Sequence, residues 1–445
     1  MELTREQQAI LDGEQGEVMA KIMKTVVMYG DTFGATKLVP ITSEYGHIVS
    51  SFGVSVITGV FDMMDELVEA GITSKQKFTA DPRPVDPAVP ANLIQKIVFK
   101  VMYGPQERYE KQLEAVGLRA DSCNAAGTST ASVAPGAAGG ASTYDDAFSC
   151  ACYLGKDANV PKRGDILSWA ESSAVSYANS VLGARCNRNS GIIEMFGSIL
   201  GYVPYFGLLT DEGRKAKWVV EVKTSKLPEA QLLGSAIGMK VVEDVPYVKG
   251  LSGYFNGELS EEACTYLKDF GAAAASNGSV GLYHIDGLTP EAKDFGEDLV
   301  APDAQVYVID DAEIQRVKNG YPVIWKKPDA KPKLAFIGCP HMTLAQLQKW
   351  TLEVETALAA NNLSKVKIPT IFTAPPAIIK EFGEENKAKL ASMGIVLSYI
   401  CPLMYMANPA CADMPVITNS NKLRTYTSAR YYTDAEILVQ IAGGY

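Results

Sequence analysis

The stretches LAFIGCP (residues 334–340) and IVLSYICP (residues 395–402) decide how the C-terminal part of this chain is expected to fold. Each is a short apolar run, typical of a buried strand, that ends at a cysteine followed by a proline. Two helical stretches and one further strand lie between them, which predicts a βαβαβ module. Because the strands of such a unit run parallel, we expect Cys339 and Cys401 at the same carboxyl edge of one sheet, where α/β proteins bind ligands.

Two thiols at one sheet edge predict a metal or iron–sulfur site whose third ligand must come from elsewhere in the chain. Cys150-Ala-Cys152 supplies candidates, although a single Cys-x-Cys pair is a weak signal. Zinc is an alternative, because His341 follows Cys339 by two residues and zinc favours mixed Cys and His ligands. The sequence lacks the closely paired cysteines of structural zinc modules. For any single cysteine, a buried structural thiol is the simpler interpretation.

The bulk composition is that of an ordinary globular protein. The chain has 445 residues, of which 47% are hydrophobic and 21% charged, enough for two or three domains. A net charge of −10 without clustered Lys and Arg argues against a nucleic-acid partner. No apolar run approaches the ~20 residues of a membrane helix, and the polar N-terminus shows no secretory signal. We therefore expect a cytoplasmic protein that binds no membrane and keeps most of its 8 cysteines reduced.

Changes in composition divide the chain into three expected regions, which are residues 1–155, 156–330 and 331–445. The first includes an Ala/Gly-rich stretch at 124–143 that is too polar and too flexible to build core. A Lys- and Pro-containing segment at 325–333 is the best candidate for a linker before the third region.

Local patterns predict several elements in the first two regions. Thr4 is the expected N-cap of an opening helix, with Gln7 completing a capping box. We further expect a strand–helix pair at 52–70 and an amphipathic helix at 94–116. Apolar runs at 218–222 and 305–309 predict strands.

The run DILSWAESSAVSYANSVLG (residues 165–183) predicts a helix with an unusual polar face, N-capped by Asp165 and stopped by Gly183. The polar stripe carries hydroxyls and an amide, at Ser168, Ser172, Ser176 and Asn179. Short uncharged polar groups suit a buried pocket, in which Glu171 would be the single acid. Arg185 and Arg188 follow and could grip a carboxylate or phosphate. The alternative is a closely packed helix whose C-terminal dipole the two arginines complement.

One long motif resembles a known family. The run DILSWAESSAVSYANSVLGARCNRN (165–189) closely resembles the signature of the large chain of aconitase X enzymes. Further matches are CACYL (150–154), GLYHIDGLTPEA (281–292), GCPH (338–341) and ITNSNK (417–422), so the resemblance covers nearly the whole chain. It implies an aconitase-like multi-domain α/β architecture around a central iron–sulfur site. It also implies a hydro-lyase that dehydrates a small hydroxy acid.

The resemblance also implies which residues form the site. An iron–sulfur cluster, [4Fe-4S] rather than [2Fe-2S], would be held by Cys150, Cys339 and Cys401. Catalytic roles are implied for Glu171, Ser172, His341 and Lys422. Substrate-binding roles are implied for Ser43, His47, Ser173, Asn179, Arg185, Arg188, Asn419 and Ser420. Cys152 stands where the family motif has Pro, and it competes with Cys150 as the first cluster ligand.

The family further implies a partner, a separate small subunit that closes over the site like a swivelling lid and supplies a Ser as base. Two family substrates compete, cis-3-hydroxy-L-proline and 5-phosphomevalonate. We favour cis-3-hydroxy-L-proline, because the composition looks bacterial. A phosphate substrate would require an additional Lys/Arg cluster in the pocket. Hypotheses of other classes are a non-catalytic aconitase-fold scaffold, motivated by departures near His47 and Asn421, and a thiol-redox protein using Cys150 and Cys152.

Overall fold

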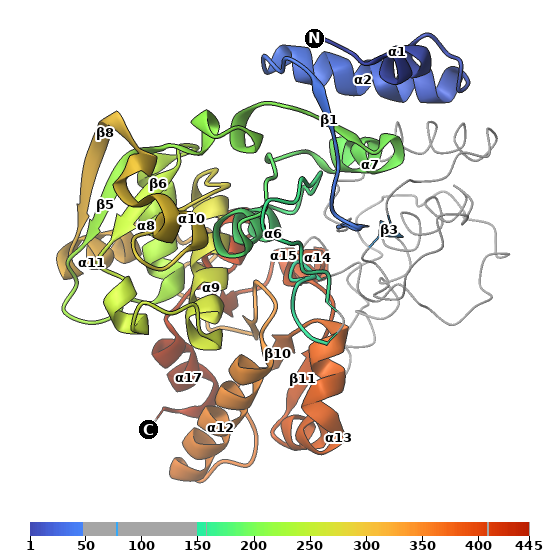
Figure 1. Ribbon diagram of the computed structural model, residues 1–445. Coiled ribbons are helices and arrows are strands. Elements are labelled where there is room, and N and C mark those ends of the chain that lie inside the picture. The colour runs from blue at the N-terminus through green and yellow to red at the C-terminus, as the bar shows by residue number, and fades with distance from the viewer. Residues whose placement is uncertain (48–76, 79–148, 157, 407–408, 445) are drawn as a thin grey trace, which may run out of the picture. The chain divides into compact units, whose positions relative to one another are not determined.

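A computed structural model describes residues 1–47, 77–78, 149–156, 158–406 and 409–444 (Figure 1). The expected elements at 52–70 and 94–116 and the Ala/Gly-rich stretch at 124–143 lie outside these residues. The described residues divide into two compact units, and each is considered by itself. The first unit holds residues 1–47, 77–78, 150–153 and 158–321, and the second holds residues 149, 154–156, 322–406 and 409–444.

The first unit begins with two helices and a short strand. Helix α1 (Arg5–Leu11) starts at the expected capping box, in which the Thr4 hydroxyl accepts from the Gln7 amide at 3.2 Å. Helix α2 (Glu17–Thr32) follows and packs against α7 (Gly191–Leu200). Strand β1 (Leu38–Pro40) then pairs antiparallel with β4 (Tyr202–Pro204), directly after α7. The N-terminal segment is thereby fixed beside α7, whose side chains enter the candidate site.

A four-stranded parallel sheet forms the other part of the first unit. In spatial order its strands are β7 (His284–Ile285), β6 (Pro246–Lys249), β5 (Ala216–Val222) and β8 (Val300–Ile309). The strands expected at 218–222 and 305–309 are therefore found, as neighbours in register within β5 and β8. Three helices connect the strands, as parallel pairing requires: α8 (Ala230–Val241), α9 (Glu261–Asn277) and α10 (Pro290–Phe295). Helix α11 (Asp311–Asn319) follows the last strand, β8.

Helices α8 and α9 approach unusually closely because glycine and alanine line their contact. A Cβ at Gly234 would lie 2.2 Å from the carbonyl oxygen of Phe270, and one at Gly238 would lie 2.5 Å from that of Ala274. Both distances are far inside van der Waals contact, so the backbone of α9 occupies the space that a side chain on α8 would need. The small residues Ala272–Ala275 continue the contact on α9 and are buried.

The signature run at 165–183 folds differently from the single helix that its sequence predicts. Residues 165–167 are extended, because Ile166 pairs with Arg185 and the Leu167 amide donates to the Arg185 carbonyl at 2.9 Å. Helix α6 (Ser172–Tyr177) starts only after Glu171, which replaces Asp165 as the N-cap. It continues as the π-helical turn η3 (Ala178–Leu182) and ends at Gly183 in a left-handed conformation with φ 73°. The expected stop is confirmed, and the expected start was wrong.

The second unit contains the predicted parallel module. In spatial order its five strands are β11 (Ile395–Ser398), β10 (Thr370–Thr373), β9 (Leu334–Ile337), β12 (Val416–Thr418) and β13 (Arg430–Tyr431). All neighbouring pairs are parallel. The βαβαβ connection from β9 through β10 to β11 is confirmed, and β12 lies on the other side of β9.

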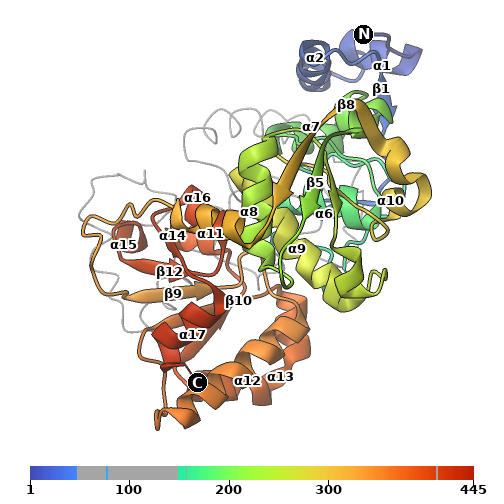
Figure 2. The same cartoon turned by 90° about the vertical axis from the view of Figure 1, so that its left-hand side faces the viewer.

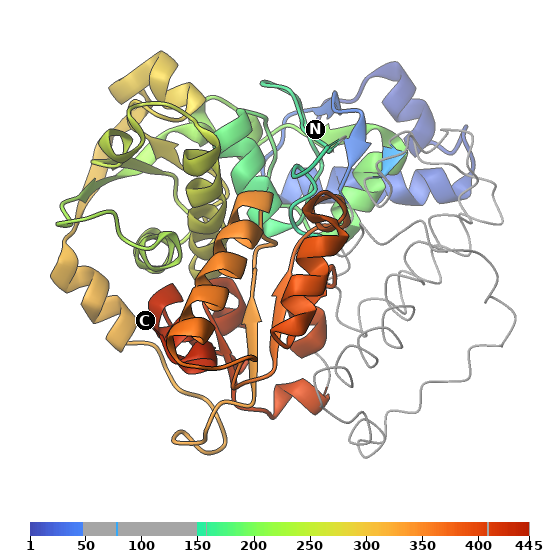
Figure 3. The same cartoon turned by 90° about the horizontal axis from the view of Figure 1, so that it is seen from below.

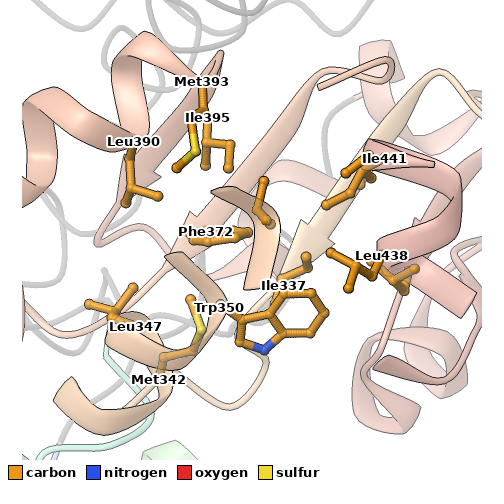
Figure 4. Close-up of a cluster of buried hydrophobic side chains, with 14 of the residues drawn as sticks. Ile337, Met342, Leu347, Trp350, Phe372, Leu390, Met393, Ile395, Leu438 and Ile441 are labelled. Atoms are coloured by element: carbon orange, nitrogen blue, oxygen red, sulfur yellow. The ribbon is translucent and has the colours of Figure 1, made fainter. Parts of the chain in front are cut away.

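Helices cover both faces of this sheet, as Figure 2 shows. One face packs against α12 (Leu344–Ala360), α13 (Pro376–Ser392) and α17 (Asp434–Ala442), and α12 and α13 run side by side in Figure 3. On this face Phe372 and Ile337 of the sheet lie beside Trp350 of α12 and Leu438 of α17 (Figure 4). The other face packs against α14 (Pro402–Met406), α15 (Pro409–Ala412) and α16 (Asn421–Tyr426). A sheet covered on both faces leaves its carboxyl edge as the natural place for a ligand.

In the close contact of α8 and α9, a Gly→Ala substitution should change stability in the direction opposite to the usual one. Replacing a helical glycine by alanine ordinarily stabilises a helix by about 0.5–1 kcal/mol. At Gly234 we expect the opposite, a loss of about 1–3 kcal/mol in the free energy of unfolding, because the new methyl would collide with the α9 backbone. Urea unfolding of Gly234→Ala, followed by circular dichroism, measures it.

Gly253→Ala is the matched control, because a Cβ there would meet nothing within 4 Å. A Gly234→Ala variant at least as stable as the wild type would show that the two helices can separate at little cost.

Candidate active site

In the first unit, the expected catalytic pair Glu171 and Ser172 lies at the start of α6. A Glu171 carboxylate oxygen accepts from the Ala174 amide at 2.7 Å and from the Ser173 hydroxyl at 2.6 Å. The carboxylate thus caps the helix, where the helix dipole favours negative charge. Ser172 opens the first turn and is half-buried, whereas Ser173 is buried against the cap.

A second carboxylate, which the sequence analysis did not identify, lies behind this helix start. Glu194 of α7 is 1% exposed, and its two carboxylate oxygens accept from the His47 amide at 2.8 Å and the Ala170 amide at 2.9 Å. Burial raises the pKa of Glu194 well above its usual value, and the two amide donors only partly oppose that rise. Glu194 thereby ties His47 to the segment before α6. The detectable signal was one acid inside the apolar run GIIEMFGSIL (191–200).

The Cys150-Ala-Cys152 segment lies beside these carboxylates. Burial raises the pKa of the Cys152 thiol well above its usual value, and the charges of Glu171 and Glu194 raise it further. The ring of Tyr153 stacks on that of Tyr177 in α6, with centroids 3.9 Å apart and planes 7° from parallel. The stack holds the segment against the helix that carries Glu171.

Asn179 lies in the π-helical turn, and its side chain is occupied within the protein. Its amide nitrogen donates to the carbonyls of Cys186 and Gly281, both at 2.8 Å. Its amide oxygen accepts from the Cys186 amide at 2.9 Å and from Arg214 at 3.2 Å. With all these bonds made, the contacts support a structural role, and substrate binding by Asn179 stays a prediction.

Arg214 and Glu291 form a buried ion pair that the sequence analysis also missed. The Arg214 Nε donates to both Glu291 carboxylate oxygens, at 2.8 and 3.1 Å, and both side chains are largely buried. The neighbouring His284 donates from Nε2 to the Arg214 carbonyl at 2.8 Å. Burial lowers the pKa of His284, which keeps its ring neutral near pH 7. With Asn179, these groups form one polar network that joins η3 to the central sheet.

The two arginines expected to bind substrate differ in their surroundings. Arg185 donates to the Leu209 carbonyl at 2.9 Å and pairs with Asp211 at 2.5 Å. Arg188 is exposed, and its stem lies over Gly281. Ser43 is buried, and its amide contacts the Ile166 carbonyl at 3.4 Å. Of the two guanidiniums, Arg188 is thus the one at the surface of the unit.

In the second unit, the two strand-end cysteines lie where the sequence predicts. Cys339 follows β9 and Cys401 follows β11, the two strands that flank β10. Because these strands are parallel, both thiols lie at the carboxyl edge, and they are only 4% and 8% exposed. Neither is in a disulfide.

The turn after β12 brings further polar groups to the same edge. Ser420 caps α16 by accepting from the Leu423 amide at 3.0 Å, and Asn419 donates to Asp434 at 2.9 Å. Lys422 in the first turn of α16 is 4% exposed, which is rare for a lysine. Strand β12 neighbours β9, so this turn and Cys339 lie at one edge of one sheet.

His341 joins this edge to Ser149 of the same unit. Its ring is completely buried, and Nδ1 lies 3.1 Å from the hydroxyl of Ser149, which belongs to the same unit. Ser149 immediately precedes Cys150 in the chain. His341 in turn lies two residues after Cys339. Each partner of this hydrogen bond is therefore within two residues of a predicted cluster ligand in the sequence.

The donors suit the expected cofactor in kind. Buried thiols outside disulfides are the ligands of iron–sulfur clusters, and Cys150, Cys339 and Cys401 have this character, as Cys186 and Cys411 do. Within the described ranges, no three His, Cys, Asp or Glu side chains are grouped as a metal site.

In the part of the chain that the structure describes, no helix is both long and apolar enough to span a bilayer.

The parallel sheets, one of them with buried thiols at its carboxyl edge, define an α/β protein, as expected. Residues 1–137 and 140–212 match the family described as aconitase X first domain, and residues 216–319 match the aconitase X second domain. The chain belongs to the aconitase X family. A crystal structure of Thermococcus kodakaraensis aconitase X in its holo form is similar, with a TM-score of 0.69 and 28% identity over 99% of each chain.

Two kinds of curated relative are similar to this chain. The phosphomevalonate dehydratase large subunit of Thermococcus kodakarensis is 31% identical over 85% of this chain and 82% of its own length. The cis-3-hydroxy-L-proline dehydratase of Hypocrea jecorina is 33% identical over 45% of this chain and 33% of its own. Both are dehydratases, so the expected enzyme class, a hydro-lyase, is confirmed. Between the two substrates, these relatives favour the alternative over the one that the sequence analysis preferred.

The raised pKa of Glu194 predicts a pH dependence. Stability that depends on the neutral carboxyl is complete below the unfolded-state pKa of about 4.3 and is lost as the pH rises through the folded-state pKa. Relative to Glu194→Gln, which cannot ionise, the wild type should therefore lose free energy of unfolding as the pH rises above about 4.3. Urea unfolding at several pH values between 5 and 8 measures the difference.

Glu258→Gln, at an exposed position, is the matched control for this series. A wild-type-minus-E194Q difference that stays constant between pH 5 and 8 would contradict the raised pKa.

The Arg214–Glu291 pair predicts a large loss on truncation. Arg214→Gln should cost about 3–5 kcal/mol of unfolding free energy, because it leaves the Glu291 carboxylate buried without its cation. Arg316→Gln, which breaks the exposed Arg316–Glu313 pair, should cost about 1 kcal/mol or less. Thermal unfolding measures the loss of stability in each variant. Equal losses would show that the buried pair contributes no more to stability than the exposed one.

Proposed function

We propose that this chain is the large subunit of an iron–sulfur-dependent dehydratase and that its substrate is 5-phosphomevalonate. The observation that carries the proposal is the placement of Cys339 and Cys401, both buried, at the carboxyl edge of one parallel sheet beside the Ser420–Lys422 turn. The substrate rests on the relatives named phosphomevalonate dehydratase large subunit, which cover most of this chain. cis-3-Hydroxy-L-proline is the second candidate.

Cys150, Cys339 and Cys401 would hold the cluster, and a four-iron cube is favoured. With three protein thiolates on such a cube, the fourth iron supplies Lewis-acid chemistry toward a substrate hydroxyl. Cys150 is preferred over Cys152, because Cys152 stands where the family motif has Pro.

The substrate's anionic group would be held by Arg188 and Lys422. Arg188 is exposed, and Lys422 is a buried lysine at the sheet edge. Arginine and lysine side chains are the usual partners of a phosphate or carboxylate. Arg185 already pairs with Asp211 and would act by shaping the loop at 207–214. Ser43, Asn419 and Ser420 would orient the surrounding turns through the hydrogen bonds described above.

Proton handling is assigned to the groups around α6 and the turn after β9. Glu171 and Ser172 lie at the start of the helix, and the Ser173 hydroxyl holds the Glu171 carboxylate in place. Glu194 holds the backbone at His47 from behind, so that the imidazole lies edge-on to Trp169. His341 would orient substrate or a cluster ligand from the second unit.

A separate small subunit of the aconitase X type is the proposed partner. Relatives that match most of this chain are named as large subunits, which supports a second chain in the working enzyme. That subunit would close over the site and bring the catalytic serine base.

A thiol-redox role for Cys150 and Cys152 is disfavoured. Thiol exchange starts from a thiolate, and reactive cysteines lie in electropositive surroundings that lower their pKa. Cys152 has the opposite environment, because burial and two carboxylates raise its pKa.

Iron content tests the cluster assignment. Purified anaerobically or reconstituted, the wild-type chain should be brown and carry about four irons. Cys150→Ala, Cys339→Ala and Cys401→Ala should each lose most of this iron. Cys264→Ala, a half-buried thiol in α9, should keep it. Iron and sulfide analysis with a visible spectrum decides, and a wild-type chain that stays colourless after reconstitution would contradict the cluster.

Turnover tests the substrate and the partner. We expect dehydration of 5-phosphomevalonate only when the chain is combined with an aconitase X small subunit, and a kcat/KM for cis-3-hydroxy-L-proline at least about 100-fold lower, since a site built for a phosphate leaves its cations unpaired without one. Arg188→Ala should raise KM for the phosphorylated substrate more than it lowers kcat. A higher kcat/KM for cis-3-hydroxy-L-proline than for 5-phosphomevalonate would contradict the substrate assignment. Full activity of this chain alone would contradict the need for a small subunit.

A further inference from the structure

We infer that Ser149 is a positioning residue of the cluster site, which fixes the backbone beside Cys150 by its hydrogen bond to His341. The inference rests on the proposed function, because it assumes that Cys150 is a cluster ligand. Ser149 is 2% exposed and its hydroxyl lies 3.1 Å from Nδ1 of His341, whose ring is completely buried. Ser149 and His341 lie in the same compact unit, although 192 residues separate them in the chain.

The bond acts next to two ligands at once. Ser149 is covalently bonded to Cys150, and His341 lies two residues after Cys339. A cluster ligand on a flexible segment must be ordered when the iron binds, and that ordering weakens binding by the entropy lost. A hydrogen bond already made in the metal-free chain removes part of that cost, as outer-shell contacts to metal ligands do in general.

The other end of the same short segment is also held. Gly155 has a left-handed backbone with φ 97°, and a Cβ there would lie 2.7 Å from that of Ala377, so the chain passes tightly against α13. Leu154 packs on the core that α12 and α13 cover. Between these two anchors, the stack of Tyr153 on Tyr177 fixes the ring that follows Cys152.

These contacts predict different consequences for the two ends. Removing the packing at Gly155 would disturb α13 and the fold of the unit. Removing the Ser149 hydroxyl deletes one oxygen atom and leaves the core unchanged. Ser149 is therefore the position at which ordering of the Cys150 segment can be reduced without breaking the fold.

The experiment compares Ser149→Ala with Ser149→Thr, which keeps the hydroxyl. Each reconstituted chain is exposed to excess EDTA under nitrogen, and iron loss is followed by the decay of visible absorbance. Ser149→Ala should lose its cluster about 10-fold faster than the wild type, the lower end of the effect of outer-shell partners. Ser149→Thr should return the rate to within about twofold. The matched control is Ser235→Ala, which removes a buried hydroxyl that donates to Asn277 at 3.0 Å in the α8–α9 contact.

A double-mutant cycle with His341→Asn adds a readout that a general loss of packing would not produce. If the two side chains act through one bond, Ser149→Ala should have little further effect on iron loss in the His341→Asn background. Hydrogen exchange of the metal-free chain should also become faster at residues 150–156 in Ser149→Ala and stay unchanged elsewhere.

The outcomes separate the two levels of the proposal. Iron loss from Ser149→Ala at the wild-type rate, or fully additive effects with His341→Asn, overturns the role of Ser149 and leaves the cluster assignment intact. A wild-type chain that takes up no iron, or Cys150→Ala that keeps it, overturns the proposed cluster ligands and the role of Ser149 with them.

Discussion

Parallel pairing of β9, β10, β11 and β12 is the constraint on which the candidate site depends. Parallel strands all end on the same side of a sheet, so residues far apart in the chain are delivered to one edge without any direct attraction between them. Cys339, Cys401 and the Ser420–Lys422 turn reach that edge because each directly follows a buried strand. The register of the sheet is fixed by apolar packing on both faces, notably around Phe372 and Trp350. Packing far from the site thus determines its geometry.

In the first unit, several ionisable side chains are buried and bound by hydrogen bonds. Glu194 and the Arg214–Glu291 pair are buried, which is costly for ionised groups unless hydrogen bonds compensate. Each compensation binds loops together: Glu194 joins His47 to Ala170, and Arg214 joins Asn179 to Glu291. The polar groups that the sequence suggests for substrate are partly used in this way. Asn179 and Arg185 bind other protein groups, and the binding roles of Arg188 and Lys422 stay predictions.

Local sequence patterns correctly predicted the structural features that depend on residues close together in the chain. The capping box at Thr4, the strands β5, β8, β9 and β11 and the cysteines at strand ends all follow from local periodicity and are found. The start of the signature helix at Asp165 was wrong, because pairing with Arg185, twenty residues away, holds that segment extended. Glu194 was missed because an acid in a helix normally faces water, and only the three-dimensional position of the His47 and Ala170 amides explains its burial. The roles of the other implied site residues stay predictions.

The burial of the Arg214–Glu291 pair has a consequence for the response to ionic strength. Dissolved ions screen charges that water can reach, with a Debye length of about 8 Å in physiological salt, and they screen buried pairs far less. The Arg214–Glu291 network should therefore hold equally well in dilute and concentrated salt, whereas exposed pairs such as Lys217–Asp244 should weaken. At the same time, salt relieves the self-repulsion of a chain with net charge −10. The signature segment around Asn179 is thus anchored by the one class of ionic contact that a change of salt concentration leaves almost untouched.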